Sequence, residues 1–432
     1  MLESPLPFSP PSTGVRPALA RVPASPIHVH KYGGSSLATP ALVGKVADAI
    51  ATIHRTGARL CVVVSAMGKT TDSLVRLAAE VAGTPTPREL DVLLSTGERI
   101  SRALMAMALE ARGVPAVSMS GPECGILTDG PHTSARIVRI DPSAVLAAMD
   151  RGQVVIAAGF QGAREDGVLT TLGRGGSDTS AVALAAALGA QRCDIFSDVD
   201  GIYTADPRIC QGAKRLDRIG YDAMEELSRQ GAKVLHERAV GHARSGNLIV
   251  RARSTFGSDA HTEIGPDQAH GVLGRHGIVG VTGRKKLLRV RVRGNDMAMQ
   301  MHGVLGHEVP VIATRSTAEH VDLWACGAEI PCPDALAERL RGEFEGAIEV
   351  HRGAGSVALV GHHGASKTAT SALLTRELAT LKIPVEAVLT ARHAVLALIP
   401  STEVDRAVQA LHRSAIETGE TVQGNTPMAC AG

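Results

Sequence analysis

The clearest chemical signal in the chain is the glycine-rich stretch 173–180, which reads Gly-Arg-Gly-Gly-Ser-Asp-Thr-Ser. It follows an apolar run, Val154–Phe160, that predicts a buried strand, and it precedes an alanine-rich run, Ala181–Leu188, that predicts a helix. Glycines let the backbone approach an anion closely, and the free amides at a helix start point at that anion. The stretch therefore indicates an anion site, and an ordinary capped glycine turn is the simpler alternative.

Two side chains in this stretch extend the prediction. Arg174 offers a fork of donors that suits phosphate or carboxylate. Asp178 could hold a metal or accept a hydrogen bond from a substrate ammonium.

Two further polar loops follow predicted strands. Residues 31–36, Lys-Tyr-Gly-Gly-Ser-Ser, come after the short strand 27–30, and residues 65–72, Ser-Ala-Met-Gly-Lys-Thr-Thr-Asp, come after the strand Arg59–Val64. Lys31 precedes its glycines, so the first loop is no Walker motif. Ligands bind at the carboxyl ends of strands in open α/β sheets, so we expect these loops to meet.

The predicted helix Glu89–Arg112 contains Gly97 and Glu98. The sequence leaves open whether Glu98 is a functional group or an ordinary solvated charge on the helix surface. A glycine inside a helix costs about 1 kcal/mol relative to alanine. A close approach by ligand or backbone would offset that cost, which favours a functional Glu98 over a solvated charge.

A third polar loop, Ser197–Arg208, follows a strand that begins at Asp194 and carries three acids, a tyrosine and an arginine. The acid pattern of a calcium-binding EF-hand loop is absent. Helix is predicted for Gly220–Ala243, which includes Gly231–His236, and a last strand for Leu248–Val250.

Composition excludes several classes. The net charge is +2 and aromatic residues make up 2%, which argues against nucleic acid and an anionic membrane as partners. No apolar run reaches the ~18 residues of a membrane span, and the start lacks a secretory pattern. Seven scattered cysteines without metal-ligand spacing suggest reduced thiols in a cytoplasm.

The 432 residues are enough for two or three domains. We expect an α/β protein: a proline-rich disordered extension at 1–26, an α/β domain at 27–256, and a linker at 257–276. A weak internal repeat then predicts two ferredoxin-like units, at 277–352 and 353–420, before a tail at 421–432.

Five of these motifs, in order, resemble those of the aspartate kinase family: 31–36, 65–72, 93–98, 173–178 and 197–208. The resemblance covers roughly residues 27–256. It implies an amino-acid-kinase fold, with an open, mainly parallel sheet between helices, followed by two ACT domains. It also implies the reaction of ATP with L-aspartate, giving 4-phospho-L-aspartate and ADP.

The resemblance further implies roles for individual residues. Lys31, Arg174 and Asp178 would serve catalysis, with Lys31 neutralising the phosphates. Glu98 would bind the substrate ammonium and Arg174 a carboxylate, in an aspartate site completed by Thr71, Gly175, Gly176 and Ser177. The nucleotide would be bound by Lys31, Tyr32, Gly33, Gly34, Ser197, Asp198, Tyr203, Asp206, Arg208 and Lys233.

No protein nucleophile or general base is required, because the substrate carboxylate is already ionised at neutral pH. Catalysis should rest on positioning and on charge neutralisation by lysine, backbone amides and the Mg²⁺ that accompanies ATP. No protein metal ligand is predicted.

The carboxyl-terminal third departs from the family pattern at Leu381–Val385 and Leu389–His393, where an effector segment is usual. We infer altered or weakened feedback by lysine or threonine as amino-acid effectors. ACT domains pair to bury sheet edges, so a homodimer through these units is expected.

Two other functions stay open from sequence. A kinase for another amino acid or for N-acetylglutamate is one, although an acetylated amine would not need Glu98. A non-catalytic amino-acid sensor is the other, and the presence of Lys31, Arg174 and Asp178 argues against it.

Overall fold

The computed structural model describes residues 25–83, 85–266, 274–294, 311–327, 330, 333–344, 347–362 and 365–418. The predicted tail at 421–432, and all but the last two residues of the predicted extension at 1–26, lie outside these ranges. In the described part of the chain, no helix is both long and apolar enough to cross a membrane.

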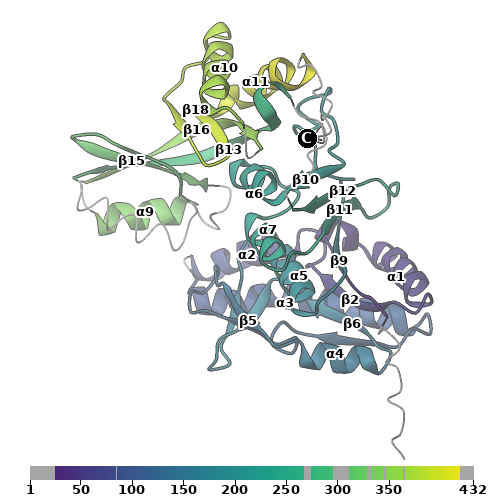
Figure 1. The fold of residues 1–432 in the computed structure, drawn as a ribbon. Helices are drawn as coiled ribbons and strands as arrows, with labels where there is room; N and C mark the ends of the chain where they lie inside the picture. The colour runs from purple at the N-terminus through teal and green to yellow at the C-terminus, as the bar shows by residue number, and fades with distance from the viewer. Residues whose placement is uncertain are drawn as a thin grey trace, which may run out of the picture.

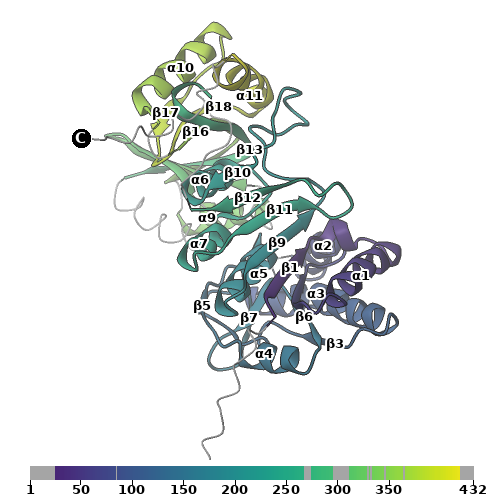
Figure 2. The ribbon, with the colours of Figure 1, turned by 45° about the vertical axis from the view of Figure 1, so that its right-hand side comes forward.

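The amino-terminal half is built on an eight-stranded sheet with the strand order β10-β12-β11-β9-β1-β2-β6-β3 (Figures 1 and 2). All neighbouring strands pair in parallel except β11 and β12. The strands are β1 (Ile27–Tyr32), β2 (Arg59–Val64), β3 (Ala116–Met119), β6 (Val154–Ala158), β9 (Arg192–Ser197), β10 (Arg218–Gly220), β11 (Val250–Ser254) and β12 (His261–Gly265). Strand β6 is wholly buried and β2 almost so, as their unbroken apolar sequences require in a sheet covered on both faces.

Helices cover both faces of this sheet. On one face, α1 (Pro40–His54) and α3 (Pro87–Glu110) pack on β1, β2 and β6. The other face carries α4 (Ser143–Asp150), α5 (Gly176–Ala187), α6 (Tyr221–Gln230) and α7 (Glu237–Ser245). The predicted α/β class with a mainly parallel sheet between helices is thereby confirmed.

Smaller elements complete this half. Helix α2 (Thr70–Ala82) follows the loop after β2. A second sheet, with the order β5-β4-β7-β8, contains β4 (Ile126–Thr128), β5 (Ile137–Ile140), β7 (Gln161–Ala163) and β8 (Leu169–Thr171).

Two local predictions differ from the structure. The helix expected over Gly220–Ala243 is divided into α6 and α7, because Gly231 adopts φ 123° and breaks the helical path. Strand β12 lies inside the expected linker 257–276, where it buries Thr262 and Ile264. The polar composition of that stretch concealed the short alternation of a half-buried strand.

The carboxyl-terminal half is a six-stranded antiparallel sheet with the order β14-β15-β13-β16-β18-β17. Its elements are β13 (Ile278–Arg293), β14 (Val311–Ser316), β15 (His320–Cys326), α9 (Pro333–Glu343), β16 (Ile348–Gly361), α10 (Lys367–Thr380), β17 (Ala387–Thr390), β18 (Ala394–Pro400), α11 (Val404–His412) and the π-helical turn η5 (Arg413–Glu417).

Strands β13 and β16 run through both halves of this sheet. Residues 278–284 of β13 pair with the end of β16, beside α10 and α11, whereas residues 287–292 pair with its beginning, beside α9 (Figure 1). The predicted boundary between residues 352 and 353 falls inside the continuous strand β16. Two separate consecutive units would need a strand to end there, but β16 continues through the boundary and, with β13, belongs to both parts of the sheet.

Candidate active site

The central contact of the site is an ion pair between β1 and α5. Lys31, at the carboxyl end of β1, places Nζ 2.5 Å from Oδ1 of Asp178 in the first turn of α5. Both side chains are largely buried. The pair brings two of the three predicted catalytic residues together. It also holds the Lys31 ammonium beside the amino end of α5.

The two loops after β1 and β2 touch through glycine. A Cβ added at Gly34 would lie 2.7 Å from the carbonyl oxygen of Ala66, so only glycine fits. The amide of Gly68 donates to the carbonyl of Gly34 at 2.9 Å. Thr71 follows in the first turn of α2, as part of the same rim.

Glu98 is buried against this rim. It is 3% exposed, and its Oε1 accepts a hydrogen bond from the amide of Ala66 at 3.0 Å. Its Oε2 is buried without a hydrogen-bond partner. Burial raises the pKa of Glu98 to about 7, against the opposing effect of the Ala66 amide and the Lys31 charge. Oε2 is thus left for a donor outside the described residues, and a ligand ammonium would supply one.

The glycine in α3 has the purpose that the sequence indicated. A Cβ at Gly97 would lie 2.7 Å from Cβ of Ala66, so the helix can approach the loop after β2 only with glycine here. This close backbone approach sets Glu98 within reach of the Ala66 amide.

The loop before α5 is shaped by left-handed glycines. Gly173 and Gly175 have φ 73° and 70°, and Arg174 stands exposed between them. A Cβ at Gly175 would collide with the side chain of His236. Ser177 lies against Gly159, where a Cβ would be 2.8 Å from that of Ser177.

Sequence reasoning missed the support beneath this loop. Asp91 is fully buried on α3, and its carboxylate contacts Nδ1 of His132 at 2.6 Å and accepts from Oγ1 of Thr171 and the amide of Thr133. Asp91 lies two turns before Glu98, on the same face of the helix. That spacing was the one available signal. His236, against Gly175, was visible in sequence only as part of the stretch 231–236.

Six of the ten predicted nucleotide residues lie at the end of β9 or in the segments after β9 and α6. Asp206 pairs with Arg208 at 2.7 Å, and the hydroxyl of Tyr203 donates to Asp200 at 2.8 Å. The hydrogen bonds from the side chain and, to a lesser extent, the backbone amide of Arg208 lower the pKa of Asp206. The charge of Lys233 lowers it further. Ser197 ends β9, and Asp198 stands exposed next to it.

Arg284 of β13 caps the end of α6 near this cluster. Its Nη2 donates to the carbonyl of Arg229 at 2.6 Å and to that of Ser228 at 3.2 Å. The carboxyl-terminal sheet therefore fixes the helix end that precedes Lys233.

Tyr32 does not fit its predicted part in nucleotide binding. Its ring is 2% exposed and stacks on Phe196, with 4.6 Å between the ring centres. Its carbonyl is used by the amide of Ser65. Tyr32 is the last residue of a strand that is covered on both faces, so its side chain packs in the core and does not reach the rim.

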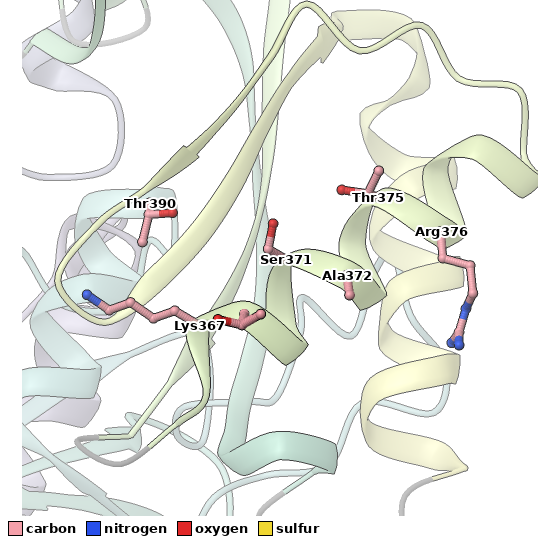
Figure 3. A pocket seen from close by; sticks show the side chains of 7 residues that line it. Lys367, Ser371, Ala372, Thr375, Arg376 and Thr390 are labelled. Carbon is pink, nitrogen blue, oxygen red and sulfur yellow. The ribbon is translucent and has the colours of Figure 1, made fainter.

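One pocket lies away from these loops. It measures about 730 Å³ and is lined by Lys367, Thr368, Ser371, Ala372, Thr375, Arg376 and Thr390 (Figure 3). These residues belong to α10 and β17, and none is a predicted site residue, so the pocket is no part of the candidate site.

Fold and site together define a member of the amino acid kinase class. The model described as the amino acid kinase family matches residues 26–252, more than half of the chain. The aspartokinase of Corynebacterium efficiens is 38% identical over 399 residues, covering 89% of this chain and 94% of that protein. The aspartokinase of Thermus thermophilus is 37% identical over 402 residues, with 89% and 98% covered. The chain belongs to the aspartokinase family.

Solved structures agree with the fold. E. coli aspartokinase III in complex with aspartate and ADP superposes with a TM-score of 0.75 at 24% identity, covering 90% of this chain and 99% of that one. The complex of the same enzyme with lysine and aspartate gives 0.67 at 25% identity, with 89% and 98% covered.

Proposed function

We propose that the protein transfers the γ-phosphoryl group of ATP to the side-chain carboxylate of L-aspartate, giving 4-phospho-L-aspartate and ADP. The observation that carries this proposal is Glu98, a buried carboxylate with one oxygen unpartnered, beside the Lys31–Asp178 pair. Such a group favours a substrate with a free ammonium, which an N-acetylated amino acid lacks. The aspartokinase relatives support the same reaction.

The residues divide the work as follows. Glu98 binds the ammonium, and the exposed guanidinium of Arg174 binds the α-carboxylate, with Thr71 and Gly175–Ser177 completing the pocket. Lys31 and the amides of Gly33 and Gly34 face the phosphates, while Ser197, Asp198, Tyr203, Asp206, Arg208 and Lys233 hold the rest of the nucleotide. The attacking oxygen is already anionic, so the protein supplies position and positive charge and moves no proton.

The donor set fits Mg²⁺ bound mainly through phosphates. In the described residues, no group of three or more His, Cys, Asp or Glu side chains is placed to hold a metal. Mg²⁺ usually keeps several waters and takes one or two carboxylates besides phosphate oxygens, and Asp178 and Asp198 are the nearby candidates. When bound, the ion neutralises charge on the β- and γ-phosphates.

A hydroxylamine trap tests the reaction directly. With ATP and Mg²⁺, we expect hydroxamate from L-aspartate and much less from L-glutamate or N-acetylglutamate. N-acetylglutamate has no free ammonium for Glu98, and the extra methylene of L-glutamate would displace its side-chain carboxylate from the γ-phosphate. Product from N-acetylglutamate and none from L-aspartate would contradict the proposal.

We also propose that the carboxyl-terminal sheet consists of ACT-type units that pair in a homodimer. Among the described strands, β14 and β17 each have one neighbour in the sheet, and pairing with a second copy would protect these edges. The five cysteines in the described ranges are buried and none of them forms a disulfide, which supports a reducing compartment such as the cytoplasm.

Regulation by amino acids stays a prediction from sequence. Because Leu381–Val385 and Leu389–His393 replace the usual effector segment, we expect lysine and threonine, alone or together at millimolar concentration, to inhibit initial rates less than twofold. Strong combined inhibition in a titration would contradict this.

A further inference from the structure

A hydrogen-bond chain, buried at Thr204 and His412 and exposed at Glu417, joins the end of the carboxyl-terminal half to the nucleotide loop. Thr204 lies in that loop, between Tyr203 and Asp206, and its Oγ1 is 2.8 Å from Nε2 of His412 on α11. Nδ1 of His412 is 2.9 Å from Oε1 of Glu417 on η5. Both Thr204 and His412 are 0% exposed.

The direction of each hydrogen bond follows from the partners. The amide of Lys214 donates to Oγ1 of Thr204 at 3.0 Å. The Glu417 carboxylate can only accept hydrogen bonds, so Nδ1 of His412 carries a proton and donates to Oε1 of Glu417. In a neutral imidazole Nε2 is then an acceptor, and the Thr204 hydroxyl donates to it. For the neutral ring, the network thus assigns one orientation to the hydroxyl and one tautomer to the imidazole.

Other contacts hold the same segment from behind. The amide of Val281 on β13 donates to the carbonyl of Thr204 at 2.7 Å, and Nε2 of Gln409 on α11 donates to the carbonyl of Ile209 at 2.9 Å. Ala205 and Cys210 are buried in the core that α11 and η5 build. The inner side of the loop therefore belongs to the carboxyl-terminal core.

The outer side of the loop carries the nucleotide residues. Tyr203 and Asp206 are partly exposed, whereas Thr204 and Ala205 between them are buried. A shift of Thr204 must change the path of the backbone on both sides of it, because its side chain and both backbone groups are fixed.

We propose that His412, oriented by Glu417, is a positioning residue for nucleotide binding and acts through Thr204 on Tyr203 and Asp206. This rests on the proposed function, in which these two residues contact ATP. His412 itself touches neither substrate; it sets the loop that does.

The test compares Thr204→Val, which keeps the shape and removes the hydroxyl, with Thr204→Ser, which keeps the hydroxyl. For Val we expect ADP to bind about tenfold more weakly by calorimetry and KM for ATP to rise by a similar factor, with KM for aspartate within twofold. Ser should restore both values. Arg406→Ala, on α11 but bonded to Glu403 and the Leu381 carbonyl, is the matched control and should bind ADP normally.

His412→Phe closes a double-mutant cycle with Thr204→Val. If both act through one bond, the double variant should bind ADP no more weakly than the worse single variant. Additive losses would overturn the proposal, and so would unchanged ADP affinity in folded Thr204→Val, or equal rises in both KM values. A wild type that binds no ADP and forms no hydroxamate would instead overturn the proposed function.

Discussion

Lys31→Met is expected to lower kcat by at least about 10²–10³-fold while the protein stays folded, since one preorganised charge that faces the transition state contributes on that order. Nζ of Lys31 lies 2.5 Å from Oδ1 of Asp178. Without it, the Asp178 carboxylate would face the phosphates unneutralised, which adds repulsion to the lost attraction. Steady-state kinetics with saturating ATP and aspartate measure the effect.

A matched control separates this role from a general effect of charge. Lys45→Met removes an exposed lysine on α1, where Nζ lies 6.0 Å from the centre of the Phe256 ring, and should leave kcat unchanged. Near-normal turnover in Lys31→Met, with the melting temperature retained, would refute the catalytic role of Lys31.

Glu98→Gln is expected to raise KM for aspartate by about 10–100-fold, the range of a lost charge-assisted hydrogen bond, with KM for ATP nearly unchanged. Glutamine keeps an oxygen for the Ala66 amide, so the loop after β2 keeps its anchor. What disappears is the charge that the substrate ammonium would meet. A variant that loses affinity for both substrates equally would speak against this assignment.

The same residue predicts a pH dependence. Burial raises the pKa of Glu98 to about 7, so the free enzyme is mostly protonated there at pH 6 and mostly ionised at pH 8. Aspartate binding requires the ionised form, and KM for aspartate should therefore fall about tenfold between pH 6 and pH 8 in the wild type. Glu98→Gln should lack this slope, and a wild-type KM that is flat across this range would contradict the prediction.

Local sequence signals located most of the rim. Apolar runs that end in glycine or polar residues predicted β1, β2 and β9 with the loops after them, and Gly97 predicted a close approach that the Ala66 contact confirms. These features are encoded within a few residues, where strand period, glycine and helix start act together.

The remaining features depend on partners distant in sequence. The stretch around β12 is a strand because β10 and β11 flank it in the sheet. Tyr32 enters the core because its ring stacks on Phe196, its partner on the neighbouring strand β9. The lengths of β13 and β16 are set by their pairing with each other. The repeat in the sequence instead predicted a boundary between two units at this point. Asp91 forms hydrogen bonds with Thr171 and His132, which lie far from it in the sequence.

The cap that Arg284 places on α6 has a consequence for how the molecule unfolds. Detaching β13 would remove the hydrogen-bond donor of the carbonyls at the end of that helix. It would also expose the side chains of Ala205 and Cys210 to solvent. Melting either half would thus strip the other of structural support, so the chain should denature as one cooperative body. Severing the polypeptide near residue 260 would yield two fragments that depend on reassociation, not a freestanding enzyme and a detachable regulator.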